Sequence, residues 1–87
     1  MGVIFLKPMR FVGDIPHPKF KISIFNWNGK YLLKIEAGMY EQTYKVNEMD
    51  MLGGGEEEIK GMVSEAFLSN VMDIFTQMHS NLLSVTE

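Results

Sequence analysis

The chain has 87 residues with a formal net charge of −3, and 46% of its residues are hydrophobic and 22% charged. This length gives room for a single domain, and the composition is that of a globular chain rather than a disordered one. There is no cysteine, which excludes disulfides, thiolate metal sites and cysteine nucleophiles and favours the cytoplasm as the compartment. The apolar stretch 1–6 ends at Lys7 and Pro8, too short for a signal sequence or a membrane span, so we expect no membrane segment.

The first part of the chain predicts short strands separated by turns. An apolar run at 3–6, ended by Pro8, predicts a first strand. The Gly-Asp-Ile-Pro-His-Pro segment at 13–18 predicts a stiff extended loop, because each proline fixes its own φ and restricts the residue before it. Apolar and polar residues then alternate over 19–27, which predicts a second strand.

The Asn-Gly pair at 28–29 predicts a tight hairpin, because both residues tolerate the positive φ that a type I′ turn requires. With this turn, Trp27 lies opposite Lys30, and Lys21 lies opposite Glu36, where an ion pair is expected. One face of the hairpin is then apolar throughout. It carries Phe20, Ile22, Ile24, Leu33 and Ile35.

A further strand is predicted over 40–46, after a turn at Gly38. Its register against the preceding strand has two alternatives. A two-residue loop at Gly38-Met39 places Glu36 opposite Glu41, whereas a four-residue loop does not.

The C-terminal part predicts a helix over 56–84. Three glutamates follow three glycines there, and negative charge stabilises a helix N-terminus. Apolar residues then recur at spacings of three and four, the pattern of a helix with one buried stripe. Gly61 and Ser64 allow either a kink or a short first helix followed by a longer one. The predicted fold is therefore α+β: an antiparallel four-stranded β-meander followed by a long C-terminal amphipathic helix packed on one sheet face.

The sheet face turned away from the helix is predicted to be basic and partly aromatic. Lysines suit contact with phosphates, and aromatic rings suit stacking on unpaired bases. Simple solvation of the lysines, which protects strand edges from aggregation, is the alternative interpretation. The candidate nucleic-acid-binding residues are Lys19, Lys21, Phe25, Trp27, Lys30 and Lys34.

This order of four strands and a helix resembles the single-stranded nucleic-acid-binding fold of the Pur repeat and of the PC4-type transcriptional coactivator. The resemblance is one of topology over most of the chain and includes no diagnostic motif. It implies binding of single-stranded DNA or RNA by the sheet, and pairing of two subunits or repeats through their helices.

The predicted helix is long enough to extend past the sheet. At 1.5 Å per residue it spans about 43 Å, against about 27 Å for an eight-residue strand. A symmetric dimer would bury the excess apolar surface, and folding of the apolar residues of 11–15 over the helix is the alternative. The candidate dimer-interface residues are Leu68, Val71, Met72, Phe75 and Leu83.

The sequence shows no set of catalytic, metal-binding or cofactor-binding residues. His17 and His79 are too few for a metal site, the glycines at 53–55 lack the Lys-Ser or Lys-Thr of a phosphate-binding loop, and no motif places a histidine beside a serine. We therefore expect a non-enzymatic interaction protein that acts as a homodimer, without a cofactor, and with a protein partner that the sequence does not identify. A regulatory protein that binds single-stranded DNA or RNA is the second hypothesis.

Overall fold

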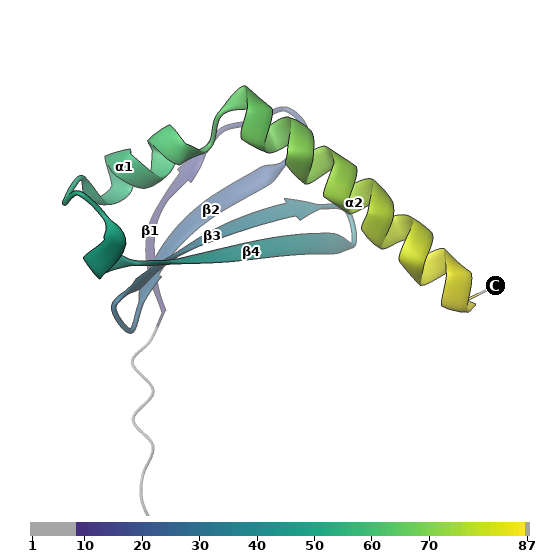
Figure 1. The fold of residues 1–87 in the computed structure, drawn as a ribbon, viewed down its shortest axis with the longest axis horizontal. Coiled ribbons are helices and arrows are strands. Elements are labelled where there is room, and N and C mark those ends of the chain that lie inside the picture. Colours follow the sequence, from purple (N-terminus) through teal and green to yellow (C-terminus); the bar gives the residue numbers. More distant parts are fainter. Residues whose placement is uncertain (1–8, 87) are drawn as a thin grey trace, which may run out of the picture.

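The computed structural model describes residues 9–86, which form one antiparallel sheet with two helices on the same side of it (Figure 1). The strands lie in chain order, β1-β2-β3-β4, which is a meander. The α+β class and the order of sheet then helix predicted from the sequence are confirmed. The elements are β1 (Arg10–Ile15), β2 (Lys21–Trp27), β3 (Lys30–Ala37), β4 (Tyr40–Asn47), the 3₁₀ turn η1 (Glu48–Asp50), α1 (Gly55–Met62) and α2 (Glu65–Thr86).

The position of the first strand differs from the prediction. The predicted strand at 3–6 lies outside the described residues, and β1 is formed by Arg10–Ile15, part of which was predicted to be loop. The reason is a bulge, because the pairing of β1 with β2 shifts between Phe11 and Gly13. A bulge interrupts the alternation of apolar and polar residues by which a strand is recognised. Gly13 also lies where an added Cβ would meet the Glu56 side chain, so a glycine suits this position.

The β2–β3 hairpin has the predicted register. Trp27 lies opposite Lys30 and Lys21 lies opposite Glu36, and the two turn residues have positive φ, 54° for Asn28 and 76° for Gly29. These angles are those of a type I′ turn, whose twist matches that of the flanking strands. Among the described residues the expected ion pair between Lys21 and Glu36 does not form, although their backbones are paired.

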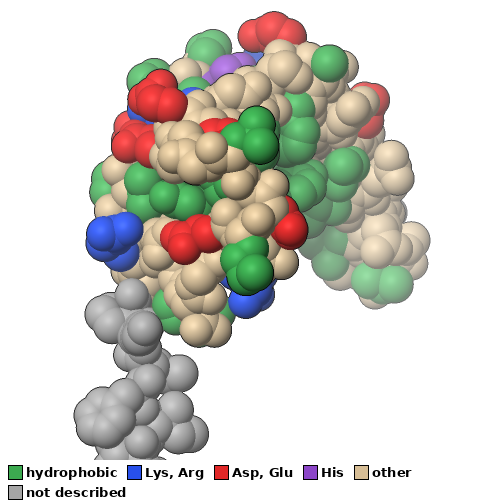
Figure 2. Space-filling model, turned by 60° about the vertical axis from the view of Figure 1, so that its left-hand side comes forward, with side chains coloured by type: hydrophobic (Ala, Val, Ile, Leu, Met, Phe, Trp, Pro, Cys, Tyr) green, Lys and Arg blue, Asp and Glu red, His purple; other side chains and the backbone are tan. Residues whose placement is uncertain are grey.

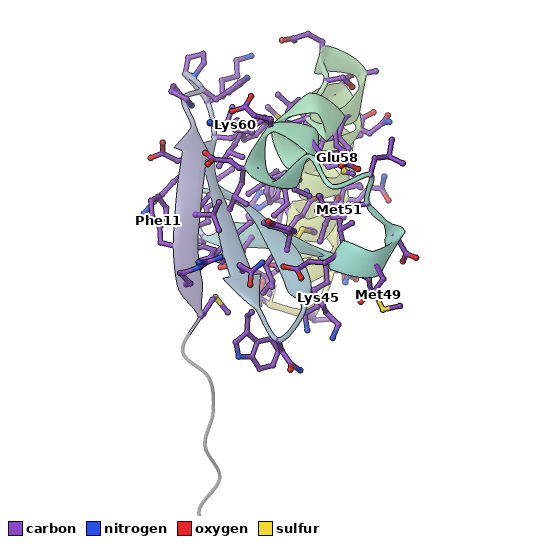
Figure 3. The ribbon with its side chains drawn as sticks, turned by 90° about the vertical axis from the view of Figure 1, so that its left-hand side faces the viewer. Phe11, Lys45, Met49, Met51, Glu58 and Lys60 are labelled. Carbon is purple, nitrogen blue, oxygen red and sulfur yellow. The ribbon has the colours of Figure 1, made fainter. Side chains whose placement is uncertain are left out.

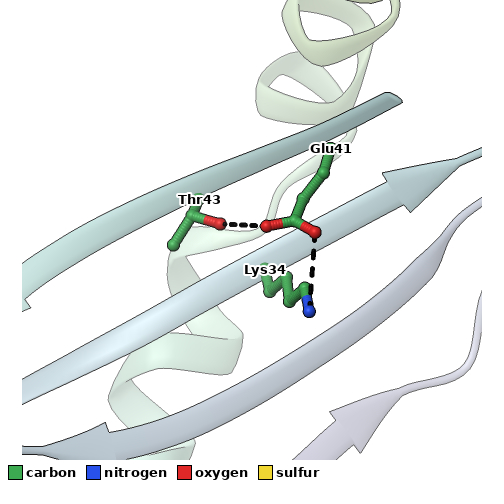
Figure 4. Close-up of polar contacts among 3 residues, drawn as sticks. All are labelled: Lys34, Glu41 and Thr43. Atoms are coloured by element: carbon green, nitrogen blue, oxygen red, sulfur yellow. Dashed lines mark hydrogen bonds and ion pairs between the residues drawn. The ribbon is translucent and has the colours of Figure 1, made fainter. Parts of the chain in front are cut away.

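The β3–β4 hairpin has the shorter of the two predicted loops, so Glu36 lies opposite Glu41. A neighbouring lysine offsets this pair of like charges. The Lys34 Nζ lies 3.5 Å from a carboxylate oxygen of Glu41, and the Thr43 hydroxyl donates to the other oxygen at 3.0 Å (Figure 4). The cross-strand lysine therefore allows the two-residue loop despite the opposed carboxylates.

The hydrophobic core lies between the helices and one face of the sheet. A buried amide also joins the two layers, because the Gln42 side chain donates to the Val71 carbonyl at 2.9 Å and accepts from the Tyr44 hydroxyl. The buried apolar residues of this core are Phe20, Ile22, Ile24, Leu33, Ile35, Ile59, Leu68, Val71 and Phe75.

The C-terminal region is a short helix followed by a longer one, which is one of the two predicted alternatives. The break falls at Val63 and Ser64, and the Ser64 hydroxyl caps α2 by accepting from the Phe67 N–H at 3.1 Å. The loop before α1 is held by Glu58, whose carboxylate accepts from the N–H groups of Leu52 and Gly54 at 2.9 Å. The break lets the chain bury apolar residues of both helices on one sheet.

A second carboxylate organises the exposed side of α1. The Glu56 carboxylate lies 2.9 Å from the Lys60 Nζ, one helical turn further on. This hydrogen bond raises the pKa of Lys60 above its ordinary 10.5. Both side chains lie at the surface, so the pair orders the helix without forming part of the core.

Candidate interaction surfaces

The face of the sheet opposite α1 and α2, here called the outer face, carries most of the predicted nucleic-acid-binding residues. Strand residues alternate between the two faces, and Ile22, Ile24 and their partners face the helices. The residues between them therefore lie on the outer face. The predicted candidates among them are Lys21, Phe25, Trp27, Lys30 and Lys34.

Two further residues, Phe11 and Lys45, lie on the outer face and were not among the predicted candidates. Phe11 lies opposite Phe25, with the ring centroids 5.7 Å apart in an edge-to-face arrangement, and it is 57% exposed. It projects from β1 on the side away from α1 (Figure 3). Lys45 lies opposite Leu32 on the same face. Phe11 was missed because no strand was predicted over its segment, and the β4 register that pairs Lys45 with Leu32 was one of two alternatives.

Lys19 does not belong to the outer face, contrary to the prediction. It precedes β2, and its backbone N–H donates to the His17 Nδ1 at 3.1 Å. Lys19 lines a depression beside the start of α2, together with Glu65 and Met72. The turn formed by His17, whose ring stacks on Phe20 at 5.0 Å, therefore directs Lys19 to the helix side of the molecule.

The outer face is only weakly basic. Lys34 is paired with Glu41, and Asp14 and Glu36 lie on the same face. The strands thus place four lysines and three carboxylates on the outer face, which leaves a small excess of positive charge on this surface. A surface of this kind would contact nucleic acid through stacking as much as through charge.

The predicted dimer-interface residues separate into two groups. Leu68, Val71 and Phe75 are buried in the core of their own chain, and this corrects their assignment to a surface. Met72 and Leu83 are exposed. The sequence pattern shows that a stripe is covered but not whether a sheet or a second chain covers it.

The apolar stripe of α2 continues beyond the part that the sheet covers. Its members recur at alternating spacings of three and four residues. The first three are buried, the fourth is half-buried, and the last two are 43% and 76% exposed. They are Leu68, Val71, Phe75, Met78, Leu82 and Val85 in order.

The last polar contact between α2 and the sheet lies one turn before the exposed end. The Tyr40 hydroxyl and the His79 Nδ1 are 2.9 Å apart at the start of β4. Every described residue after His79 is exposed, over a helical length of about 10 Å. This segment, 80–86, is here called the overhang, and Figure 1 shows it extending past the end of the sheet.

The surface of α2 carries little charge. After Glu65, the only carboxylate of α2 is that of Asp73. Most of the other exposed polar positions of this helix are occupied by uncharged residues. Burial of such a surface does not require removal of water from charged groups, which is costly. The uncharged exposed residues are Ser69, Asn70, Thr76, Gln77, Ser80, Asn81, Ser84 and Thr86.

Exposed hydrophobic side chains also lie outside the stripe of α2. In the space-filling view they continue from the region between the helices and the sheet toward the end of α2 (Figure 2). Met39 in the β3–β4 turn and Met49 in η1 are each more than nine-tenths exposed. Together with the overhang they form a discontinuous apolar surface around the two ends of β4.

The described part of the chain brings together no group of three or more histidine, aspartate or glutamate side chains suited to hold a metal ion. Neither helix within 9–86 combines the length and the hydropathy needed to cross a membrane. No protein-family model matches the chain, and comparisons with curated proteins and with solved structures return no match. The resemblance to the Pur repeat and to the PC4-type coactivator therefore stays a prediction.

Proposed function

We propose that this protein is a non-catalytic interaction protein that acts as a homodimer, with the overhang of α2 in the dimer interface. The observation that carries the proposal is the continuation of one apolar stripe from the core into solvent. Leu82 and Val85 keep the spacing of the buried residues Val71 and Phe75, yet the sheet ends before it reaches them. A residue at such a position gains stability when a second surface covers it, by about 25 cal/mol for each Å² of apolar area.

A second copy of the chain is a suitable cover for this stripe. Glu65 and Asp73 are the only carboxylates of α2, so a second copy can approach this helix with little of the repulsion expected of a chain with net charge −3. Two copies related by a twofold axis would each contribute the same exposed residues, as symmetric dimers do.

The proposal is tested by multi-angle light scattering of the wild-type chain and of the double variant Leu82→Glu/Val85→Glu. We expect a dimeric mass for the wild type at micromolar concentration and a monomeric mass for the variant, because four carboxylates would be buried in its interface. The matched control is Ser80→Glu/Ser84→Glu, which adds the same charge on the solvent side of the overhang and should stay dimeric. A monomeric wild type would contradict the proposal.

Binding of single-stranded DNA or RNA by the outer face is a second candidate function. The observation that favours it is the group of three aromatic residues, Phe11, Phe25 and Trp27, on a face that also carries lysines. Unpaired bases stack on exposed rings while lysines contact the phosphates, and neither contact requires a defined sequence.

Fluorescence anisotropy with labelled single-stranded DNA and RNA tests this second candidate. We expect micromolar binding in low salt that weakens as salt is raised. Phe11→Ala and Trp27→Ala should each weaken binding by roughly fivefold to a hundredfold, the range measured for loss of a stacked base. Lys60→Ala on α1 removes a positive charge away from the outer face and is the control. Absence of binding in low salt would end this interpretation.

A further inference from the structure

The β4 strand forms one edge of the sheet, and among residues 9–86 only β3 pairs with it. The two-residue turn makes Ala37 and Tyr40 a hydrogen-bonded pair, so alternate residues of β4 from Tyr40 onward bond to β3. The backbone N–H and C=O groups of Glu41, Thr43 and Lys45 therefore point outward, away from β3. These groups are available to another strand.

The side chains of the same three residues carry a charge pattern that is complementary to itself. Glu41 and Lys45 are exposed and lie two residues on either side of Thr43. If a second β4 runs antiparallel with Thr43 at the centre, Glu41 lies opposite the partner's Lys45, and Lys45 lies opposite the partner's Glu41. Cross-strand pairs of opposite charge stabilise antiparallel strands, whereas like charges oppose them.

We propose that two copies of the chain pair through β4, antiparallel and centred on Thr43, so that the two sheets become one. This inference rests on the homodimer proposed above and names the surface that forms it. The twofold axis passes between the two Thr43 residues at right angles to the sheet. All the helices then lie on one side of the joined sheet and the two outer faces lie on the other.

Other registers do not have this complementarity. A slip of one residue would place outward-pointing backbone groups opposite groups that already bond to β3. A slip of two residues in one direction places Lys45 opposite the partner's Thr43 and Glu41 opposite the partner's Asn47. A slip of two residues in the other direction places Glu41 opposite the partner's Thr43 and Lys45 opposite the partner's Met39. Only the register centred on Thr43 brings opposite charges together on both sides of the axis.

Two features prepare Glu41 and Lys45 for this role. The Glu41 carboxylate is held by Lys34 at 3.5 Å and by the Thr43 hydroxyl at 3.0 Å, so it is oriented on the outer face beside the edge (Figure 4). Lys45 makes no ion pair within the described residues. A lone lysine on an edge strand discourages pairing with a second strand. Here Lys45 would lie opposite the partner's Glu41, so the same lysine favours pairing with an antiparallel copy.

This pairing also accounts for the exposed apolar surface at the two ends of β4. The helix α2 lies over β4, because Phe67 packs on Tyr44 and His79 contacts Tyr40. In the antiparallel pair the Tyr40 end of β4, and with it the overhang, lies beside the segment that follows the partner's Val46. That segment contains the partner's Met49, which is 95% exposed in the single chain and projects outward (Figure 3). The overhang and η1 would then cover each other across the axis.

Charge exchange tests the pairing. The variants Glu41→Lys and Lys45→Glu each place like charges opposite one another in their own homodimer, and we expect self-association about tenfold to thirtyfold weaker. An equimolar mixture of the two variants restores both opposite-charge pairs, so it should form a dimer of one chain of each. The double variant Glu41→Lys/Lys45→Glu should also recover wild-type association. Glu36→Lys and Lys21→Glu, which change the charge in the same way on inner strands, are the controls.

Hydrogen exchange of the wild-type chain gives a second measurement that needs no substitution. The amides of Glu41, Thr43 and Lys45 should exchange more slowly as the chain concentration rises through the dissociation constant, while those of Phe11 and Asp14 on β1 should not change. If the wild type is dimeric but these amides and both charge variants behave as the controls do, the β4 pairing is wrong and the homodimer stands. If the wild type is monomeric, both proposals fail.

Discussion

Replacement of Phe75 by alanine is expected to destabilise the folded chain by about 3–5 kcal/mol, the range found for truncation of a buried aromatic residue. Phe75 is buried in the core between α2 and the sheet, and the centroid of its ring lies 5.8 Å from that of Phe20. The free energy of unfolding of a domain of this size is roughly 5–10 kcal/mol. The substitution therefore removes a large part of the stability.

Urea denaturation followed by circular dichroism measures the effect of Phe75→Ala. Thr76→Ala, one residue further along α2 and exposed, is the control and should change the free energy of unfolding by less than about 1 kcal/mol. A loss at Phe75 no larger than that at Thr76 would show that α2 does not rest on the sheet as described.

Replacement of Ile59 by alanine is the second large expected effect, a loss of about 2–5 kcal/mol. Ile59 is the one buried residue of α1, and its side chain is 0% exposed. Because the other contacts of α1 are at the surface, loss of this side chain should free α1 from the sheet while α2 stays in place. The change should therefore appear as local as well as global loss of stability.

Native-state hydrogen exchange separates these two effects of Ile59→Ala. Amides of α1 should exchange much faster in the variant, and those of α2 should change less. Met62→Ala on the same helix, where the side chain is partly exposed, serves as the control and should have a small effect. Equal acceleration throughout both helices would mean that α1 and α2 open as one unit.

Local signals were sufficient to predict the β2–β3 hairpin from the sequence. The Asn-Gly pair fixes the turn, the turn fixes the register, and the register places every side chain on a face. The same reasoning could not choose the β3–β4 register, because the opposed Glu36 and Glu41 argued against the correct loop. The contact that resolves this conflict joins Lys34 to Glu41 diagonally across β3 and β4. It can be recognised only once the β3–β4 register is known.

Features that depend on tertiary packing were predicted less well. The bulge between Phe11 and Gly13 breaks the alternation that reveals a strand, so no strand was predicted over β1 and Phe11 was left out of the candidate site. An apolar stripe on the C-terminal helix was predicted, but Leu68, Val71 and Phe75 were assigned to a dimer because the sequence does not show how far the sheet extends under the helix. The helix break at Ser64 was one of two alternatives, and its capping contact decides between them.

The irregular edge at β1 has a consequence for how large an assembly this sheet can build. A strand edge grows into a polymer when each added chain offers a fresh regular edge to the next one. Here the bulge at Phe11 and Gly13 disturbs the spacing of the backbone groups along β1, whereas β4 is regular over its eight residues. Pairing through β4 would leave β1 at both ends of the joined sheet. Growth would then end at two chains, because the irregular edge of β1 offers no regular template for a further strand.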